Sequence, residues 1–229
     1  MPQASQKSAS VRQEAYGQKR LTWVDRFGVY LSKRRILRYL PRRDDLSIVD
    51  LGCGYHATLL RALVHQAGAG LGVDVRISPE ARAIPKLSFM ESTIESALPE
   101  LEDGRFNVVL LISVLEHLWE PLPVLEHCWR ILRPGGVLMV NVPTWRGKWF
   151  LEFSAFRLGT SPMVEMDDHK MYYNESDLWP LLVRAGFKPS RLRLRYHKFG
   201  LNLFAVAQKE PNVGQAFLPD NQKASGSKA

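Results

Sequence analysis

Two aspartates and a pair of glycines are the first residues of this chain whose types and spacing indicate chemistry. Asp50 lies in a short apolar run, Gly52 and Gly54 follow it directly, and Asp74 ends the next apolar run. Glycines remove the side chains that would keep a ligand away from the backbone, and they permit a tight turn. An acid at the tip of the second strand is where nucleotide-binding α/β folds hold a ribose diol. The four residues therefore indicate a site for a ligand that contains a nucleoside.

Two cofactors fit this arrangement, and a strand-turn-helix without any ligand is a third reading. Gly52, Gly54 and Ala57 satisfy the G-x-G-x-x-A pattern of a dinucleotide site, although that pattern alone is weak. Asp50 would repel the pyrophosphate of a dinucleotide, whereas it suits the α-ammonium group of a methionine moiety. The residues therefore favour S-adenosylmethionine.

Apolar strands that alternate with helical segments must position these residues. Strands are expected at 47–51, 71–74, 86–90, 106–112, 137–142, 188–196 and 201–207, and helices at 58–66, 122–132 and 175–185. The run 106–112 is apolar almost throughout, as in a strand that is buried on both faces. This alternation predicts an α/β fold with a doubly wound, mostly parallel sheet, and the last two strands are expected to form a hairpin.

Charge and composition divide the chain into segments. The 229 residues carry a net charge of +8, but residues 1–43 hold eleven basic and two acidic residues, so the rest of the chain is almost neutral. We expect a disordered N-terminus at 1–18, a basic amphipathic helical segment at 19–43, one domain at 44–209 and a disordered tail at 210–229. The aromatic and basic stretch 143–173 interrupts the domain after a strand and is expected to form a lid over the ligand.

The same composition bears on the cellular compartment. No stretch has the roughly 18 uninterrupted apolar residues of a membrane span, and residues 1–10 lack the apolar core of a secretory signal. The chain contains two cysteines, which do not suggest a disulfide framework. We therefore expect a cytoplasmic protein. The helical segment 19–43 has three possible roles: packing on the domain with a solvated basic face, peripheral contact with anionic lipid, or contact with RNA or another acidic partner.

Taken together, the motifs of residues 45–208 resemble the class I S-adenosylmethionine-dependent methyltransferases, in particular those that act on small molecules. The matching stretches are Val49–Gly54, Gly72–Asp74, Phe106–Leu118, Arg130–Gly136, His169–Tyr173 and Ala185–Phe187. The resemblance implies a Rossmann-like fold of seven strands with the last strand antiparallel. It also implies S-adenosylmethionine as the cofactor and S-adenosylhomocysteine as its product.

The resemblance implies roles for residues that match the family motifs. Gly52, Cys53 and Gly54 would approach the cofactor, with Asp50 near its methionine end. Asp74 would bind the ribose, and Ser113 would lie beside the methionine part. The acid that often holds adenine after the third strand has no clear counterpart, so Ser92, Thr93 or the backbone would contact adenine.

Methyl transfer to a hydroxyl or amine releases a proton, and histidine is the side chain best matched to accept it near neutral pH. His117 follows the strand that ends beside the cofactor, and His169 lies in the expected lid. Either histidine is a candidate base, and either could instead have a structural role; His56, in the glycine turn, is expected only to line the pocket. The acids and histidines lack a recognisable ligand spacing, so no metal site is expected.

The aromatic and basic lid suits an acceptor that is apolar or bears a sugar and carries negative charge. Residues 152–170 also resemble, more loosely, methyltransferases of surface-polysaccharide or lipid-linked glycan assembly. We therefore expect a small-molecule, glycan or lipid-linked acceptor, with the hydroxyl of a quinone or secondary metabolite as another option. An RNA methyltransferase and a non-catalytic cofactor-binding module remain alternatives, although the neutral body of the chain makes nucleic acid a weak prediction.

Overall fold

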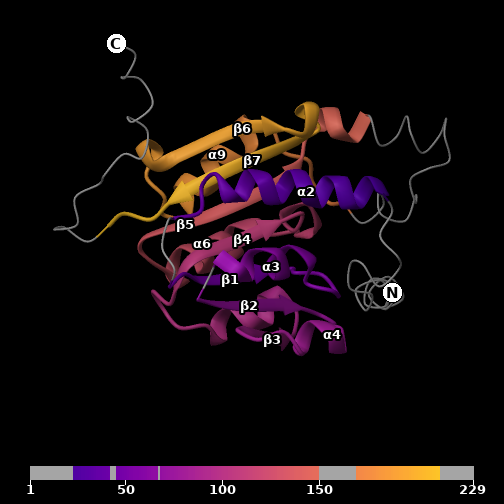
Figure 1. The fold of residues 1–229 in the computed structure, drawn as a ribbon. Helices are drawn as coiled ribbons and strands as arrows, with labels where there is room; N and C mark the ends of the chain where they lie inside the picture. The colour runs from indigo at the N-terminus through magenta and orange to yellow at the C-terminus, as the bar shows by residue number, and fades with distance from the viewer. Residues whose placement is uncertain (1–22, 42–44, 67, 150–168, 212–229) are drawn as a thin grey trace, which may run out of the picture.

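The computed structural model describes residues 23–41, 45–66, 68–149 and 169–211. Within them the chain forms a layered α/β domain around one sheet (Figure 1). The predictions for residues 1–18 and for most of the tail 210–229 lie outside the described residues, as do the ends of the segment 19–43 and residues 150–168 of the lid.

Seven strands form the sheet, in the order β3-β2-β1-β4-β5-β7-β6. They are β1 (Ser47–Leu51), β2 (Ala69–Asp74), β3 (Leu87–Glu91), β4 (Phe106–Ile112), β5 (Leu132–Pro143), β6 (Leu192–His197) and β7 (Asn202–Gln208). Neighbours among β1 to β5 pair in parallel, whereas β7 is antiparallel to both β5 and β6. This topology confirms the predicted seven-stranded, mostly parallel sheet with an antiparallel last strand. Consequently all strands except β7 end at the same edge of the sheet.

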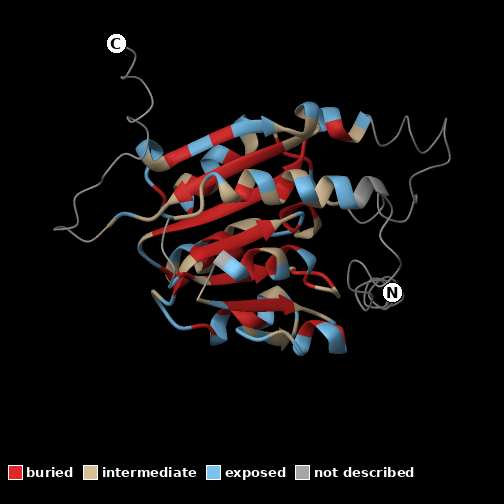
Figure 2. Cartoon of the chain, in the orientation of Figure 1, coloured by how far each residue is buried: buried red, intermediate tan, exposed pale blue. Residues whose placement is uncertain are grey.

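Helices cover both faces of the sheet (Figure 1). α2 (Trp23–Leu37) and α3 (Thr58–Leu63) lie on one face, while α5 (Ile94–Ala97), α6 (Pro121–Ile131) and α9 (Glu175–Arg184) lie on the other. The short helix α4 (Pro79–Arg82) connects β2 to β3. Successive residues of β4 enter different cores, since Val108 packs with the α2 and α3 face and Val109 with the α6 and α9 face. The apolar run of β4 is therefore buried on both sides, as Figure 2 shows for the central strands.

Three strands differ from their predicted bounds by two or more residues. β2 starts at Ala69, two residues early, and β6 starts at Leu192, because Pro189–Arg191 form a 3-10 turn. β5 differs most. β5 was expected to start at Val137 after a turn at Pro134–Gly136, but it begins at Leu132, which pairs with Phe106 across a shift in register. Gly135 adopts a φ of 79°, and its N–H donates to the carbonyl groups of Lys209 and Glu210. The backbone of this turn is thus held in the sheet by the residues that follow β7.

The N-terminal helix packs on the domain through part of its apolar residues. Ile36 is fully buried and Ser32 is also buried, whereas the apolar side chain of Phe27, near the start of the helix, is 50% exposed. Arg35, expected among solvated basic residues, places its guanidinium carbon 5.9 Å from the ring centre of Tyr39 and 5.7 Å from that of Phe204. Part of the positive charge of this segment therefore faces the domain. None of the helices in the described part of the chain is long and apolar enough to span a membrane.

Candidate functional site

The glycine turn lies between β1 and α3 in the chain and is hydrogen-bonded to the end of β2. Gly52 and Gly54 have φ values of 78° and 76°, a left-handed conformation that side chains disfavour. The N–H groups of Gly52 and Cys53 both donate to the carbonyl of Val73, at 2.8 and 3.1 Å. A Cβ atom on Gly52 would lie 2.5 Å from Cγ2 of Val114, so close packing also requires glycine there. The turn is therefore fixed at the carboxyl edge of the sheet.

Asp74 fastens this turn to the end of β2. Its carboxylate accepts hydrogen bonds from the N–H of Gly54, at 2.7 Å, and from the N–H of Val75, at 2.8 Å. Burial raises the pKa of Asp74, and these backbone hydrogen bonds oppose the rise. A carboxylate oxygen accepts more than one hydrogen bond, so the group keeps acceptor capacity for a diol.

Asp50 is a buried acid beside the same turn. It is 2% exposed, and burial, followed by the charge of Asp74, raises its pKa to about 7. A cationic group placed nearby would favour the ionised carboxylate. Cys53 is also buried, and burial raises the pKa of its thiol, so this side chain lines the turn as a neutral group.

The remaining predicted cofactor residues lie at the ends of β3 and β4. Ser113 is exposed directly after β4, with a φ of 60°, and its N–H donates to the carbonyl of Asn141. The N–H of Ser92 donates to the carbonyl of Asp74 at 3.0 Å. The hydroxyl of Thr93 caps α5 by accepting from the N–H of Ser96, so Thr93 has a structural task in addition to any ligand contact. All three lie at the edge that carries the glycine turn.

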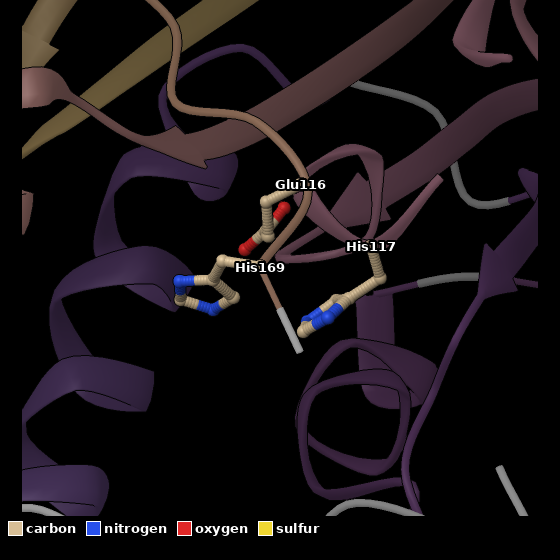
Figure 3. Close-up of side chains that lie close together, drawn as sticks. All are labelled: Glu116, His117 and His169. Atoms are coloured by element: carbon tan, nitrogen blue, oxygen red, sulfur yellow. The ribbon is translucent and has the colours of Figure 1, made fainter. Parts of the chain in front are cut away.

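The two candidate bases meet at this edge, beside an acid. The ring centres of His117 and His169 are 5.0 Å apart in an edge-to-face arrangement. Glu116, His117 and His169 offer three ligand atoms within 4.8 Å of one another, and Figure 3 shows the carboxyl group and both rings close together. His56, by contrast, contacts its neighbour Tyr55 in the glycine turn. We call Glu116, His117 and His169 the Glu-His-His cluster.

Backbone hydrogen bonds bring the two parts of the cluster together. Glu116 and His117 lie in the short 3-10 helix η3 (Leu115–His117), which follows β4. The N–H groups of Lys170 and Met171 both donate to the carbonyl of Glu116, and the hydroxyl of Tyr173 donates to the carbonyl of Leu115. Residues 169–173 are thereby docked on η3, with His169 beside His117.

Glu116 is the residue of this cluster that sequence reasoning left without a chemical role. It is 2% exposed, and among the described residues its Oε2 atom has no hydrogen-bond partner. Burial raises the pKa of Glu116 to about 8, while the charge of Lys198, in the 3-10 turn η5 (Lys198–Gly200), acts in the opposite direction. The sequence signal was adjacency to His117, but adjacency alone does not show that a glutamate is buried.

Comparison with known proteins identifies the family. A family model described as a methyltransferase domain matches residues 23–191. The chain belongs to the class I S-adenosylmethionine-dependent methyltransferases. This methyltransferase is 31% identical over 157 residues to a protein of Mycolicibacterium smegmatis named as a probable S-adenosylmethionine-dependent methyltransferase, covering 67% of this chain and 56% of the relative.

A second relative carries a more specific name. The ubiquinone biosynthesis O-methyltransferase of Xanthomonas oryzae pv. oryzae is 29% identical to this methyltransferase over 119 residues, covering 46% of this chain and 47% of the relative. The chain spans about half the length of the curated relatives it matches.

Solved structures agree with the fold of this methyltransferase. A methyltransferase of Haloferax volcanii, solved with its activator Trm112, aligns with a TM-score of 0.64 and 18% identity, over 80% of this chain and 91% of that one. A methyltransferase of Archaeoglobus fulgidus aligns with a TM-score of 0.59 and 16% identity, over 79% and 94%. At this identity the likeness shows the fold alone.

S-adenosylmethionine is the cofactor of this family, and the residues at the edge fit it. The left-handed glycines leave backbone without side chains at the turn, Asp50 supplies an acid for an ammonium group, and Asp74 supplies acceptors for a diol. These groups therefore match the ammonium group and the ribose diol of S-adenosylmethionine.

Proposed function

We propose that this methyltransferase transfers a methyl group from S-adenosylmethionine to a hydroxyl oxygen of a small-molecule acceptor. The observation that carries the proposal is the Glu-His-His cluster, because it places proton-accepting groups at the edge that holds the glycine turn. The relative named as an O-methyltransferase supports an oxygen acceptor, although it covers only 46% of the chain. An amine acceptor would use the same arrangement.

The chain's own residues hold the cofactor and the acceptor in line. Asp50 pairs with the α-ammonium group, Gly52 and Gly54 allow close approach of the backbone, Asp74 accepts from the ribose, and Ser113 lies at the methionine end. Cys53 lines the turn, and Ser92 and Thr93 lie on the adenine side. The bound cofactor supplies an electrophilic methyl group with a neutral thioether as the leaving group. The main task of the protein is therefore to position the nucleophile.

His117 or His169 accepts the proton that the acceptor hydroxyl releases. Each imidazole has two ring nitrogens, of which one carries a lone pair in the neutral form. The hydroxyl of Tyr172 lies 3.2 Å from Nδ1 of His169 and orients that ring. Such a base contributes on the order of 10²- to 10⁴-fold to the rate.

The rim around the cluster suits an acceptor with an apolar or sugar part and a negative charge. Exposed aromatic residues lie after β5 and in η5, with Trp149 at 74% and Phe199 at 90% exposure. The ammonium group of Lys148 lies 5.7 Å from the ring centre of Trp145 and 5.9 Å from that of Tyr172. These contacts favour a glycan or lipid-linked acceptor, and the exposed side of α2 would then contact a membrane surface.

The test is transfer of radiolabelled methyl groups from S-adenosylmethionine into host extract, separated into lipid and glycan, small-molecule, RNA and protein fractions. Label in the lipid and glycan or small-molecule fraction, lost with Asp74→Ala, is the expected result. Label in RNA would overturn the acceptor class. Binding of S-adenosylhomocysteine without label in any fraction would instead favour a non-catalytic module.

A further inference from the structure

We propose that the Glu-His-His cluster binds a divalent transition-metal ion. The cluster joins two parts of the chain that are far apart in the sequence, since Glu116 and His117 come from η3 and His169 lies about 50 residues later. Two imidazoles and one carboxylate form a ligand set that binds first-row divalent metals. The sequence predicted no metal site because these residues have no regular spacing.

The distances in the cluster are close to those that an ion requires. Metal–nitrogen and metal–oxygen bonds in such sites are about 2.0–2.2 Å long, so ligand atoms around one ion lie about 3–4 Å apart. The three atoms here lie within 4.8 Å of one another. Both histidines are only partly buried, so small rotations of the rings bring the nitrogens to the bonding distance.

The unpartnered oxygen of Glu116 is a second, independent sign of a ligand. Oε2 is buried and has no hydrogen-bond partner among the described residues. A buried acceptor without a partner destabilises the fold, because it has lost its hydrogen bonds to water. In Figure 3 this carboxyl group lies beside both imidazoles. A cation held by the two rings would supply the missing partner.

The surroundings hold His169 in an orientation suited to binding an ion. Metal-bound histidines usually donate their second ring N–H to a neighbouring oxygen, which fixes the tautomer. The hydroxyl of Tyr172 lies 3.2 Å from Nδ1 of His169, which leaves Nε2 for the ion when Nδ1 carries the proton. The backbone hydrogen bonds from Lys170 and Met171 to Glu116 fix the distance between the two sides of the cluster.

The ligand types indicate which ions bind. Imidazole suits Zn²⁺, Cu²⁺, Fe²⁺ or Ni²⁺, whereas Mg²⁺ prefers a shell of oxygen atoms. Three protein ligands leave at least one position open, as in catalytic zinc sites. A water molecule or an acceptor oxygen would take that position.

The role of the ion rests on the proposed function, whereas its binding does not. The bound ion would lower the pKa of an acceptor hydroxyl, which would give its proton to solvent water. As the new O–CH₃ bond formed, the S–CH₃ bond would break, and the electron pair of that bond would stay on the departing sulfur. His117 and His169 would then be ligands, and the ion would take the place of the histidine base of the proposed function.

Isothermal titration of the tag-free full-length chain with Zn²⁺, after treatment with a chelator and dialysis, tests the site directly. We expect about one Zn²⁺ per chain, and binding at least about tenfold weaker in His117→Ala, His169→Ala and Glu116→Gln. Mg²⁺ is expected to bind more weakly than Zn²⁺. His65→Ala is the matched control, because His65 is exposed in the 3-10 helix η1 (Val64–Gln66), close to the start of β1 and β2 at the opposite edge of the sheet.

S-adenosylhomocysteine binding, measured on the same preparations, shows whether each variant is folded. If a histidine variant fails to fold, Glu116→Gln still tests the site, because it keeps the shape of the side chain. Absence of saturable Zn²⁺ binding, or equal binding in all three cluster variants and the wild type, would overturn the metal site. If Zn²⁺ binds as expected but no hydroxyl acceptor is methylated, the site stands and the proposed function fails. If the chain binds no Zn²⁺ but still transfers methyl groups after metal removal, the metal site fails and the proposed function stands.

Discussion

The imidazoles of His117 and His169 lie edge to face with ring centres 5.0 Å apart, although all of α6 and β5 separates them in the chain. Two residues that act at one place do not contribute independently. We expect His117→Ala and His169→Ala each to lower turnover at least about tenfold, and the double variant to lower it by less than the product of the two effects.

Initial rates with a fixed acceptor and saturating S-adenosylmethionine measure these effects. His65→Ala is the control, because His65 is exposed in η1, at the edge of the sheet opposite the cluster. If neither single variant loses tenfold in turnover, the hypothesis that a histidine accepts the proton is wrong.

Two adjacent tyrosines are expected to have different tasks: one orients the ring of His169, and the other holds residues 169–173 against η3. The hydroxyl of Tyr172 contacts Nδ1 of His169, whereas the hydroxyl of Tyr173 donates to the carbonyl of Leu115. Tyr172→Phe should lower kcat several-fold with little change in thermal stability. Tyr173→Phe should lower the free energy of unfolding by about 1 kcal/mol, because one buried hydrogen bond is lost. Steady-state kinetics and urea unfolding of both variants check this, and equal effects on both quantities would argue against separate roles.

Asp50 gives the cofactor-free protein a defined dependence on pH. Its pKa rises from an ordinary value of 3.8 to about 7, mainly through burial. Between these values the folded protein keeps a proton that the unfolded chain releases, so the free energy of unfolding falls as pH rises and levels off above about pH 7. From pH 5 to pH 7 the loss from this group is about 2 kcal/mol, because the slope of about 1.4 kcal/mol per pH unit flattens near pH 7.

Asp50→Asn removes the titrating group while keeping its shape. Urea unfolding of the wild type and the variant at about pH 5 and pH 8 should therefore show a smaller loss of stability in the variant. Parallel stability curves for the two proteins would mean that Asp50 does not titrate in this range.

Asp74 is expected to govern binding of the cofactor. Asp74→Ala removes a charged acceptor for the ribose together with the hydrogen bonds that fasten Gly54 and Val75. Hydrogen bonds to charged groups contribute about 1.5–3 kcal/mol, so S-adenosylhomocysteine should bind roughly 10- to 100-fold more weakly in calorimetric titrations. Asp103→Ala, which removes an exposed carboxylate paired with Arg130, is the control and should bind normally. Unchanged affinity in Asp74→Ala would remove Asp74 from the cofactor site.

The exposed side of α2 is expected to bind anionic vesicles. Phe27 and Tyr30 are 50% and 55% exposed and stack with ring centres 6.4 Å apart. Replacing both with alanine should weaken cosedimentation with phosphatidylserine-containing vesicles about tenfold, because aromatic area and positive charge act together at such surfaces. Trp179→Ala, in α9 on the other face of the sheet, is the control. Wild-type protein that does not sediment with these vesicles would exclude this contact.

The sequence by itself was enough to predict the sheet and the turn. Apolar runs marked the central strands, because a strand buried on both faces must be apolar at nearly every position, and the alternation of Arg and Leu marked the half-exposed β6. The first strand was predicted with its observed bounds, Ser47–Leu51. Gly52, Gly54 and the acid at the end of β2 identified the turn, because backbone conformation and strand ends are local properties.

Tertiary structure alone decided which long-range neighbours meet. Apolar spacing did not show that Phe27 of α2 is exposed while Ser32 is buried, since both depend on the surface that the helix covers. Likewise, the sequence offered His117 and His169 as separate candidates and gave Glu116 no chemical role. They meet because the N–H groups of Lys170 and Met171 bond to the carbonyl of Glu116. Local patterns specify strands and turns. The contact between Glu116 and residues 169–171 forms only in the folded chain, because these residues are far apart in the sequence.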